Sequence, residues 1–213
     1  MTPAQERALR DAMIKVLEKA SATTAIQFVD VQGKLTVDAK GFREVIDCLN
    51  AKFFGKIGVG GFSQDTRPGS GGFYSEGEDK FYFPEGFNIS GTDGEAAVVH
   101  EAVHALQNIK ERTYVYPEHE LAAYTAEVLY YRYRAKQTKA KETAFGKRAS
   151  SDPKLAKLLK AAEAVAVVFE NQSPGSRQLT TDIKEVAALL AAVKAFPLYQ
   201  NKKRMGKTEK REW

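Results

Sequence analysis

The chain has 213 residues, of which 43% are hydrophobic and 28% are charged, and its formal net charge at pH 7 is +5. This composition is typical of a globular domain with one hydrophobic core, and no run approaches the roughly 18 apolar residues that a membrane helix needs. The single cysteine, Cys48, cannot form a disulfide within the chain, which excludes a small disulfide-held scaffold and favours a reducing compartment.

The first fifty residues predict two helices with a hairpin between them. Thr2 followed by Pro3 starts a helix that runs to about residue 20. This segment carries charges throughout and has no apolar stretch typical of a Sec-type signal peptide. We therefore expect a cytoplasmic protein, or one exported without a cleaved N-terminal signal. Residues 24–39 read as two short strands around a turn at Gly33, and Asp38 caps a helix that ends near residue 52.

Residues 55–91 are rich in glycine and aromatic side chains. The stretches GGFYS (71–75) and KFYFP (80–84) predict strands joined by the turn EGED. The stretch SQDTRPGSGG (63–72) is predicted to be a loop, either a mobile lid over a site or a plain connector.

A helix with an apolar surface follows, and it carries the sequence HEAVH at residues 100–104. Thr92 and Glu95 have the spacing of a capping box at its start. His100 and His104 are four residues apart and therefore project from the same face, with Glu101 one step around the helix. Two imidazoles on one helical turn can converge on a zinc ion at about 2.0–2.1 Å. A neighbouring glutamate can then take a proton from water that the zinc has made acidic.

This HExxH stretch resembles the zincin metallopeptidases. The metzincin form of the motif continues with a glycine and a third histidine at short spacing, which this sequence lacks. The gluzincin form takes its third ligand from a glutamate on the next helix, often followed three positions later by a small residue. Glu120 with Ala123, in a helix that Pro117 starts, fits that form. The resemblance thus implies zinc ligands His100, His104 and Glu120, with Glu101 as the general base.

Several roles around this site stay open in the sequence. His119, Glu118 and Glu127 are the alternatives to Glu120 as third ligand. Glu127 lies two helical turns after Glu120, so it either orients a histidine or is a plain surface carboxylate. For stabilising the oxyanion, His119 is the first choice, and the other candidates are Tyr114, Tyr116 and Tyr124. Zincins receive the substrate backbone on an edge strand before the motif helix, and residues 80–86 are predicted to be that strand.

The C-terminal part predicts two more helices, one from Pro153 to about residue 170 and one capped by Asp182. Residues 132–148 hold seven basic side chains against one acid, and residues 201–213 hold six against two. Such segments can bind an anionic partner such as nucleic acid, but no nucleic-acid-binding module accompanies them. We favour a solvated helix end and a flexible basic tail.

Together these features predict one α+β, zincin-like domain over residues 1–200, with its core at about 25–135 and a helical part at about 150–197. It has a small, mostly antiparallel sheet, an HExxH helix and further helices at both ends. The predicted function is zinc-dependent hydrolysis of a protein or peptide substrate, in a bacterial regulatory protease or a toxin-like effector. The alternative is a non-catalytic domain that a metal stabilises and that contacts nucleic acid or a partner protein.

Overall fold

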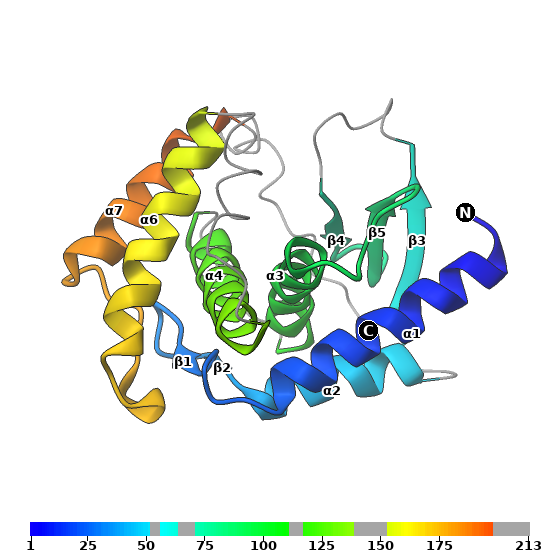
Figure 1. Ribbon diagram of the computed structural model, residues 1–213, viewed down its shortest axis with the longest axis horizontal. Coiled ribbons are helices and arrows are strands. Elements are labelled where there is room, and N and C mark those ends of the chain that lie inside the picture. The colour runs from blue at the N-terminus through cyan, green and yellow to red at the C-terminus, as the bar shows by residue number, and fades with distance from the viewer. Residues whose placement is uncertain (52–55, 64–70, 111–116, 139–152, 198–213) are drawn as a thin grey trace.

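The computed structural model describes residues 1–51, 56–63, 71–110, 117–138 and 153–197. Within these ranges the protein is α+β, with long helices and two small sheets (Figure 1). The helices are α1 (Pro3–Ser21), α2 (Ala39–Asn50), α3 (Thr92–Ile109), α4 (Glu118–Thr138), α6 (Pro153–Glu170) and α7 (Lys184–Ala195), with a short 3-10 helix η1 (Pro174–Ser176). The strands are β1 (Phe28–Val29), β2 (Thr36–Val37), β3 (Gly58–Phe62), β4 (Phe73–Ser75) and β5 (Lys80–Pro84).

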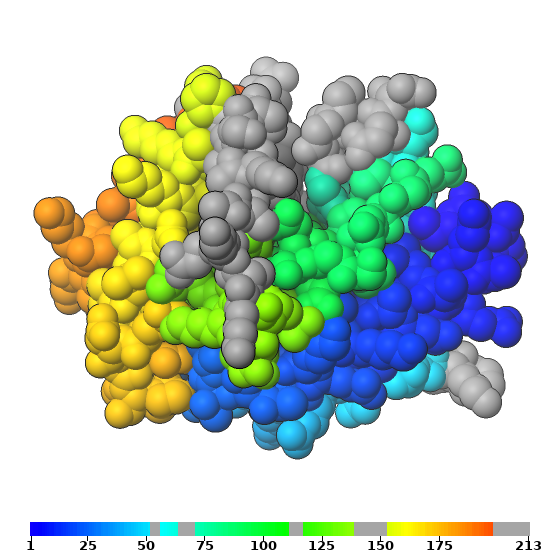
Figure 2. All heavy atoms as spheres, in the orientation of Figure 1, coloured from blue at the N-terminus to red at the C-terminus, as the bar shows by residue number. Residues whose placement is uncertain are grey.

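The helices α3 and α4 lie side by side at the centre of the molecule (Figure 1). The pair α6 and α7 packs against α4 on one side, and the three-stranded sheet lies on the other side of α3, while α1 and α2 run beneath. Figure 2 shows α6 and α7 at one end of the molecule and α1 at the other. As a result α3 and α4 are buried over most of their length, and polar side chains on them must find partners inside the protein.

Local signals at the first two helices are confirmed. The Thr2 side chain accepts a hydrogen bond from the backbone of Gln5, whose own side chain accepts from the backbone of Thr2 in a full capping box. Asp38 caps α2 by accepting from the backbone of Gly41. The predicted hairpin is the antiparallel pair of β1 and β2, and Gly33 in its turn has the positive φ of +67° that favours glycine.

Helices α3 and α7 begin close to where they were predicted, but the side-chain caps predicted for them are wrong. The residue that precedes α3 is Gly91, and it makes no side-chain capping bond. Glu95 instead turns its carboxylate to the cations of Lys19 and Arg134, because hydrogen bonds from charged donors are stronger than those from a helix N–H. At α7 the capping position is Ile183, while the carboxylate of Asp182 accepts from the Thr180 hydroxyl.

The larger sheet has the strand order β3-β5-β4. The predicted pair of β4 and β5 is antiparallel and confirmed, but β3 was missed, and it runs parallel to β5. The sequence of β3, GVGGF, is typical of a loop; pairing with β5 makes it a strand. The prediction that residues 80–86 form an edge strand is wrong, because β5 is the central strand. On the described residues β4 is the sheet edge nearest α3.

Three of the predicted features fall partly or wholly outside the described residues: the loop at 63–72, the second half of the basic segment at 132–148, and the tail at 201–213. In the described half of that segment the cations are paired with acids, namely Arg132 with Glu163 and Glu170, Arg134 with Glu95, and Lys136 with Glu170. Within the described ranges, no helix combines the length and apolar character that crossing a bilayer requires.

Candidate metal centre

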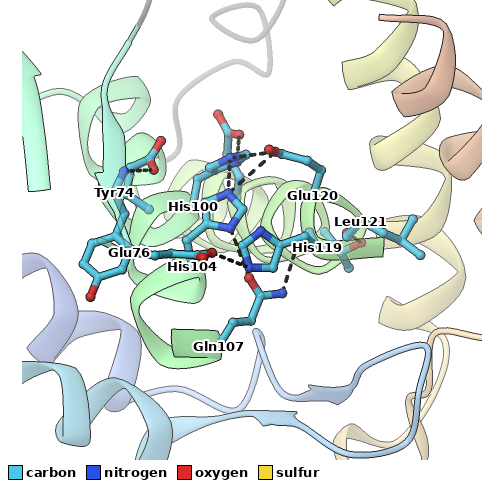
Figure 3. Close-up of polar contacts among 11 residues, drawn as sticks. Tyr74, Glu76, His100, His104, Gln107, His119, Glu120 and Leu121 are labelled. Atoms are coloured by element: carbon cyan, nitrogen blue, oxygen red, sulfur yellow. Dashed lines mark hydrogen bonds and ion pairs between the residues drawn. The ribbon is translucent and has the colours of Figure 1, made fainter. Parts of the chain in front are cut away.

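Three side chains from two helices converge between α3 and α4 (Figure 3). The Nε2 atoms of His100 and His104 are 3.3 Å apart, and the Oε2 atom of Glu120 lies 3.4 Å from the first and 3.6 Å from the second. All three residues are buried, with exposed fractions of 8%, 7% and 5%. They form a group that could hold a metal ion.

The size of this triangle can be compared with known zinc geometry. Four ligands at 2.0–2.1 Å around a tetrahedral zinc ion lie about 3.3–3.4 Å from one another. The three separations of 3.3, 3.4 and 3.6 Å are therefore close to those of a tetrahedral zinc site with three protein ligands. Two imidazole nitrogens and a carboxylate oxygen are also donors that zinc accepts.

The electrostatics of the group favour a positive charge at the same place. Burial alone would lower the pKa of His100, but the carboxylates of Glu120 and Glu127 raise it to about 10. Burial would likewise raise the pKa of Glu120, but His104 and His100 hold it well below its usual value. A buried carboxylate that stays ionised beside two imidazoles stabilises whichever cation lies among them, proton or metal.

Among the four candidates for third ligand, the structure brings only Glu120 into the triangle. Glu118 turns to the Gln32 side chain, whose Nε2 donates to it at 3.0 Å. Glu127 lies behind His100, where its Oε2 is 2.9 Å from the Nδ1 atom of the ring. It is 2% exposed, so it is the orienting group that the sequence allowed and not a surface carboxylate.

His119 lies beside the triangle. Its ring is tilted against that of His104 with the centroids 4.5 Å apart, and its Nε2 atom is 3.2 Å from the Oε1 atom of Glu76 in the turn between β4 and β5 (Figure 3). Tyr124, one of the other oxyanion candidates, meets the His100 ring edge-on at 4.6 Å. Tyr114 and Tyr116 lie outside the described residues.

Glu101 faces the sheet. Its Oε2 atom accepts a hydrogen bond of 2.9 Å from the backbone N–H of Tyr74 in β4. The hairpin is tied to α3 a second time, since Asn108 donates to the Tyr74 hydroxyl at 3.0 Å and to Asp79 at 2.8 Å. Glu101 is thus held one step from the triangle, on the side of the edge strand.

No protein-family model, curated protein or solved structure matches this chain. Its function is therefore inferred from the chemistry of the site.

Sequence reasoning missed Gln107, which is fully buried and hydrogen-bonded to His104. A signal was present, because residues three apart share a helix face and Gln107 follows His104 by three. It also missed Tyr74 and Glu76. Their contacts depend on how the hairpin packs against the helices, for which the sequence carries no local signal.

Proposed function

We propose that this protein is a zinc-dependent metallopeptidase of zincin type, with His100, His104 and Glu120 as the zinc ligands. The observation that carries the proposal is the convergence of these three donors at separations of 3.3–3.6 Å, with Glu101 next to the first ligand. A structural zinc site is closed by four protein ligands, whereas a catalytic site has three and keeps one position open. Among the described residues three donors converge, which favours a catalytic site.

The residues around the site have complementary tasks. Zinc held there supplies Lewis acidity, which polarises a carbonyl group and makes water acidic near neutral pH. Glu101 takes a proton from water as the oxygen attacks the carbonyl carbon of the peptide. It then gives this proton to the leaving nitrogen as the C–N bond breaks, so one water is consumed for each bond. The Tyr74 N–H occupies one carboxylate oxygen of Glu101 and fixes the side chain, which leaves the second oxygen for the proton.

The role proposed for His119 is to stabilise the carbonyl oxygen of the substrate. A positively polarised N–H near this oxygen stabilises the negative charge that develops on it during the reaction. Glu76 supports this role in the protonated ring, because its carboxylate contacts Nε2 and stabilises the imidazolium, whose Nδ1–H can then face the carbonyl oxygen. The imidazole lies against His104, so a carbonyl group bound beside that histidine would lie near the His119 ring.

The substrate is assigned to β4, which is the edge strand among the described residues, instead of to β5. The N–H of Tyr74 points away from β5, since it donates to Glu101 on α3. In an antiparallel strand the C=O of a residue lies on the same side as its N–H, so the Tyr74 C=O also faces away from β5 and can accept a hydrogen bond from an extended polypeptide laid along this edge. The Tyr74 N–H itself stays with Glu101, which places the scissile bond over the motif helix. Protein or peptide in extended form is accordingly the proposed substrate class.

The experiment compares zinc-loaded wild type with Glu101→Gln and Glu118→Gln on denatured casein and on a mixed-sequence fluorogenic peptide library. Metal content is measured in the same samples. We expect one zinc per chain in all three proteins and cleavage by wild type. We expect Glu101→Gln to be slower by about 10²–10⁴-fold, because it has lost the general base. Glu118→Gln is the matched control, since this residue lies in the same first turn of α4 as Glu120 but its carboxylate bonds to Gln32.

Two results would contradict the proposal. Cleavage by Glu101→Gln at the wild-type rate would show that this carboxylate is not the base. Zinc-loaded wild type that cleaves neither casein nor any library peptide would favour the alternative, a non-catalytic domain that a metal stabilises.

A further inference from the structure

Gln107 is a polar side chain in the interior of the protein, with 0% of its surface exposed. It lies near the end of α3, one turn after His104 and on the same face. A buried amide without hydrogen bonds is destabilising by about 1–3 kcal/mol, so its partners explain why it is there.

Both ends of the Gln107 amide are bonded (Figure 3). Its Oε1 atom is 3.0 Å from Nδ1 of His104, and its Nε2 atom donates to the backbone carbonyl of His119 at 3.1 Å. The first bond lies within α3, and the second crosses to α4. The residue after His119 is Glu120, so the amide connects the second ligand directly to the residue preceding the third.

These two partners of Gln107 determine that Nδ1 of His104 carries a hydrogen. A backbone carbonyl can only accept, so the NH₂ end of the amide must face His119 and the oxygen must face His104. That oxygen can also only accept, and Nδ1 of His104 must therefore carry a hydrogen. In the neutral ring Nε2 then has a free electron pair, and this is the atom 3.6 Å from Glu120 Oε2.

Different side chains thus orient the two histidines. His100 is oriented by the Glu127 carboxylate, and His104 is oriented by the neutral amide of Gln107. Glu127 is on α4 and acts across the helix interface, whereas Gln107 reaches the same helix through a main-chain carbonyl. Each ring is therefore held by a group that also joins α3 to α4.

We infer that Gln107 is a positioning residue for the metal site: its amide selects the Nδ1–H tautomer of His104 and joins that ligand to the first turn of the helix bearing Glu120. This inference rests on the metal site of the proposed function but not on peptide cleavage. Outer groups of this kind change metal affinity by about 10–100-fold when they are replaced.

The test uses Gln107→Met, which keeps the length of the side chain but removes both bonds, and Gln107→Glu, which keeps an acceptor for His104 and loses the donor to His119. The control is Asn108→Leu. It removes the neighbouring amide on α3, which bonds to Tyr74 and Asp79 and not to a ligand. Zinc affinity is measured by competition with a chromophoric chelator, and folding of each variant is checked by circular dichroism.

We expect Gln107→Met to bind zinc about 10–100-fold more weakly than wild type. We expect Gln107→Glu to recover part of that loss, because the acceptor for the ring remains. Asn108→Leu should stay within about threefold of wild type, although it removes two hydrogen bonds of the hairpin and lowers stability. Equal zinc affinity of wild type and Gln107→Met, or an equal loss in Asn108→Leu, would overturn the inference.

A second readout needs no metal. The long-range ¹H–¹⁵N spectrum of the metal-free protein reports which ring nitrogen of each histidine carries hydrogen. We expect Nδ1 of His104 to carry a hydrogen throughout the wild-type sample, whatever the state of Nε2, and in only part of the Gln107→Met sample. An Nε2–H tautomer in wild type would contradict the inference even if zinc binds and peptides are cleaved. Conversely, the expected spectra together with a failure to cleave peptides would refute the peptidase proposal alone.

Discussion

The carboxylate of Glu95 joins three helices at the start of the motif helix, and its replacement by glutamine is our sharpest test of the fold. The side chain accepts hydrogen bonds from Lys19 of α1 at 2.6 Å and from Tyr130 and Arg134 of α4 at 2.9 and 2.7 Å. It is 5% exposed. Glu95→Gln keeps the shape of the side chain but removes the negative charge with which Lys19 and Arg134 are paired.

The expected loss of stability depends on how exposed Lys19 and Arg134 are. Removing one partner of a fully buried ion pair destabilises a protein by about 3–5 kcal/mol. Lys19 is 45% exposed and can turn to water, so its share is below about 1 kcal/mol. Arg134 is 23% exposed, and its charge-assisted bond contributes about 1.5–2 kcal/mol. We therefore expect Glu95→Gln to lower the free energy of unfolding by about 2–3 kcal/mol.

The assay is urea unfolding followed by circular dichroism, at one fixed zinc concentration because a bound metal adds to stability. Glu18→Gln, an exposed carboxylate on α1, is the control and should change stability by less than about 0.5 kcal/mol. A loss below about 0.5 kcal/mol for Glu95→Gln would refute the reasoning. Burial opposes ionisation of Glu95, but bonds from Lys19, Arg134 and Tyr130 lower its pKa. Its contribution is accordingly present at neutral pH and lost as the solution is acidified, so the two proteins should converge in acid.

Two further predictions concern stability. Hydrogen bonds from Arg132 lower the pKa of Glu170 to about 2, although partial desolvation opposes this shift. The ionised carboxylate therefore stabilises the protein at pH values above its ordinary pKa of about 4.5. This stabilisation is lost as the pH falls from about 4.5 to about 2. Glu170→Gln should lower the free energy of unfolding by about 2–3 kcal/mol at pH 7 and by almost nothing near pH 2. Gly94→Ala should be destabilising by more than about 2 kcal/mol in the same urea assay, because the added Cβ would lie 2.1 Å from the backbone oxygen of Asn88. Gly77→Ala, which meets nothing within 4 Å, is its control.

Each of these two predictions has a result that would contradict it. A Glu170→Gln difference that does not change between pH 7 and pH 2 would mean that the ion pair with Arg132 contributes nothing measurable. Equal stability of Gly94→Ala and Gly77→Ala would mean that the loop at Asn88 moves away from α3 without cost.

Much of the local structure was determined by the sequence alone. Thr2 and Asp38 have side chains that bond backbone groups three residues away, so their caps need no distant partner. His100 and His104 likewise share a face without help from distant residues, because they are one helical turn apart. The β4–β5 hairpin was also predictable from its two aromatic stretches and the EGED turn between them. Features of this kind depend on spacing along a single element.

The tertiary structure decided what lies between elements. Glu118 and Glu120 both start α4, and only the angle at which this helix packs on α3 turns the second one toward the histidines. Glu95 had the spacing of a capping residue, yet distant cations with stronger bonds took its carboxylate. The central place of β5 likewise depended on β3, whose glycine-rich sequence becomes a strand only by pairing. The sequence determined two candidate ligands and their direction, because helical periodicity is local. The candidate third ligand, the side chains that orient the rings and the sheet edge at β4 required packing, because each joins segments far apart in the chain.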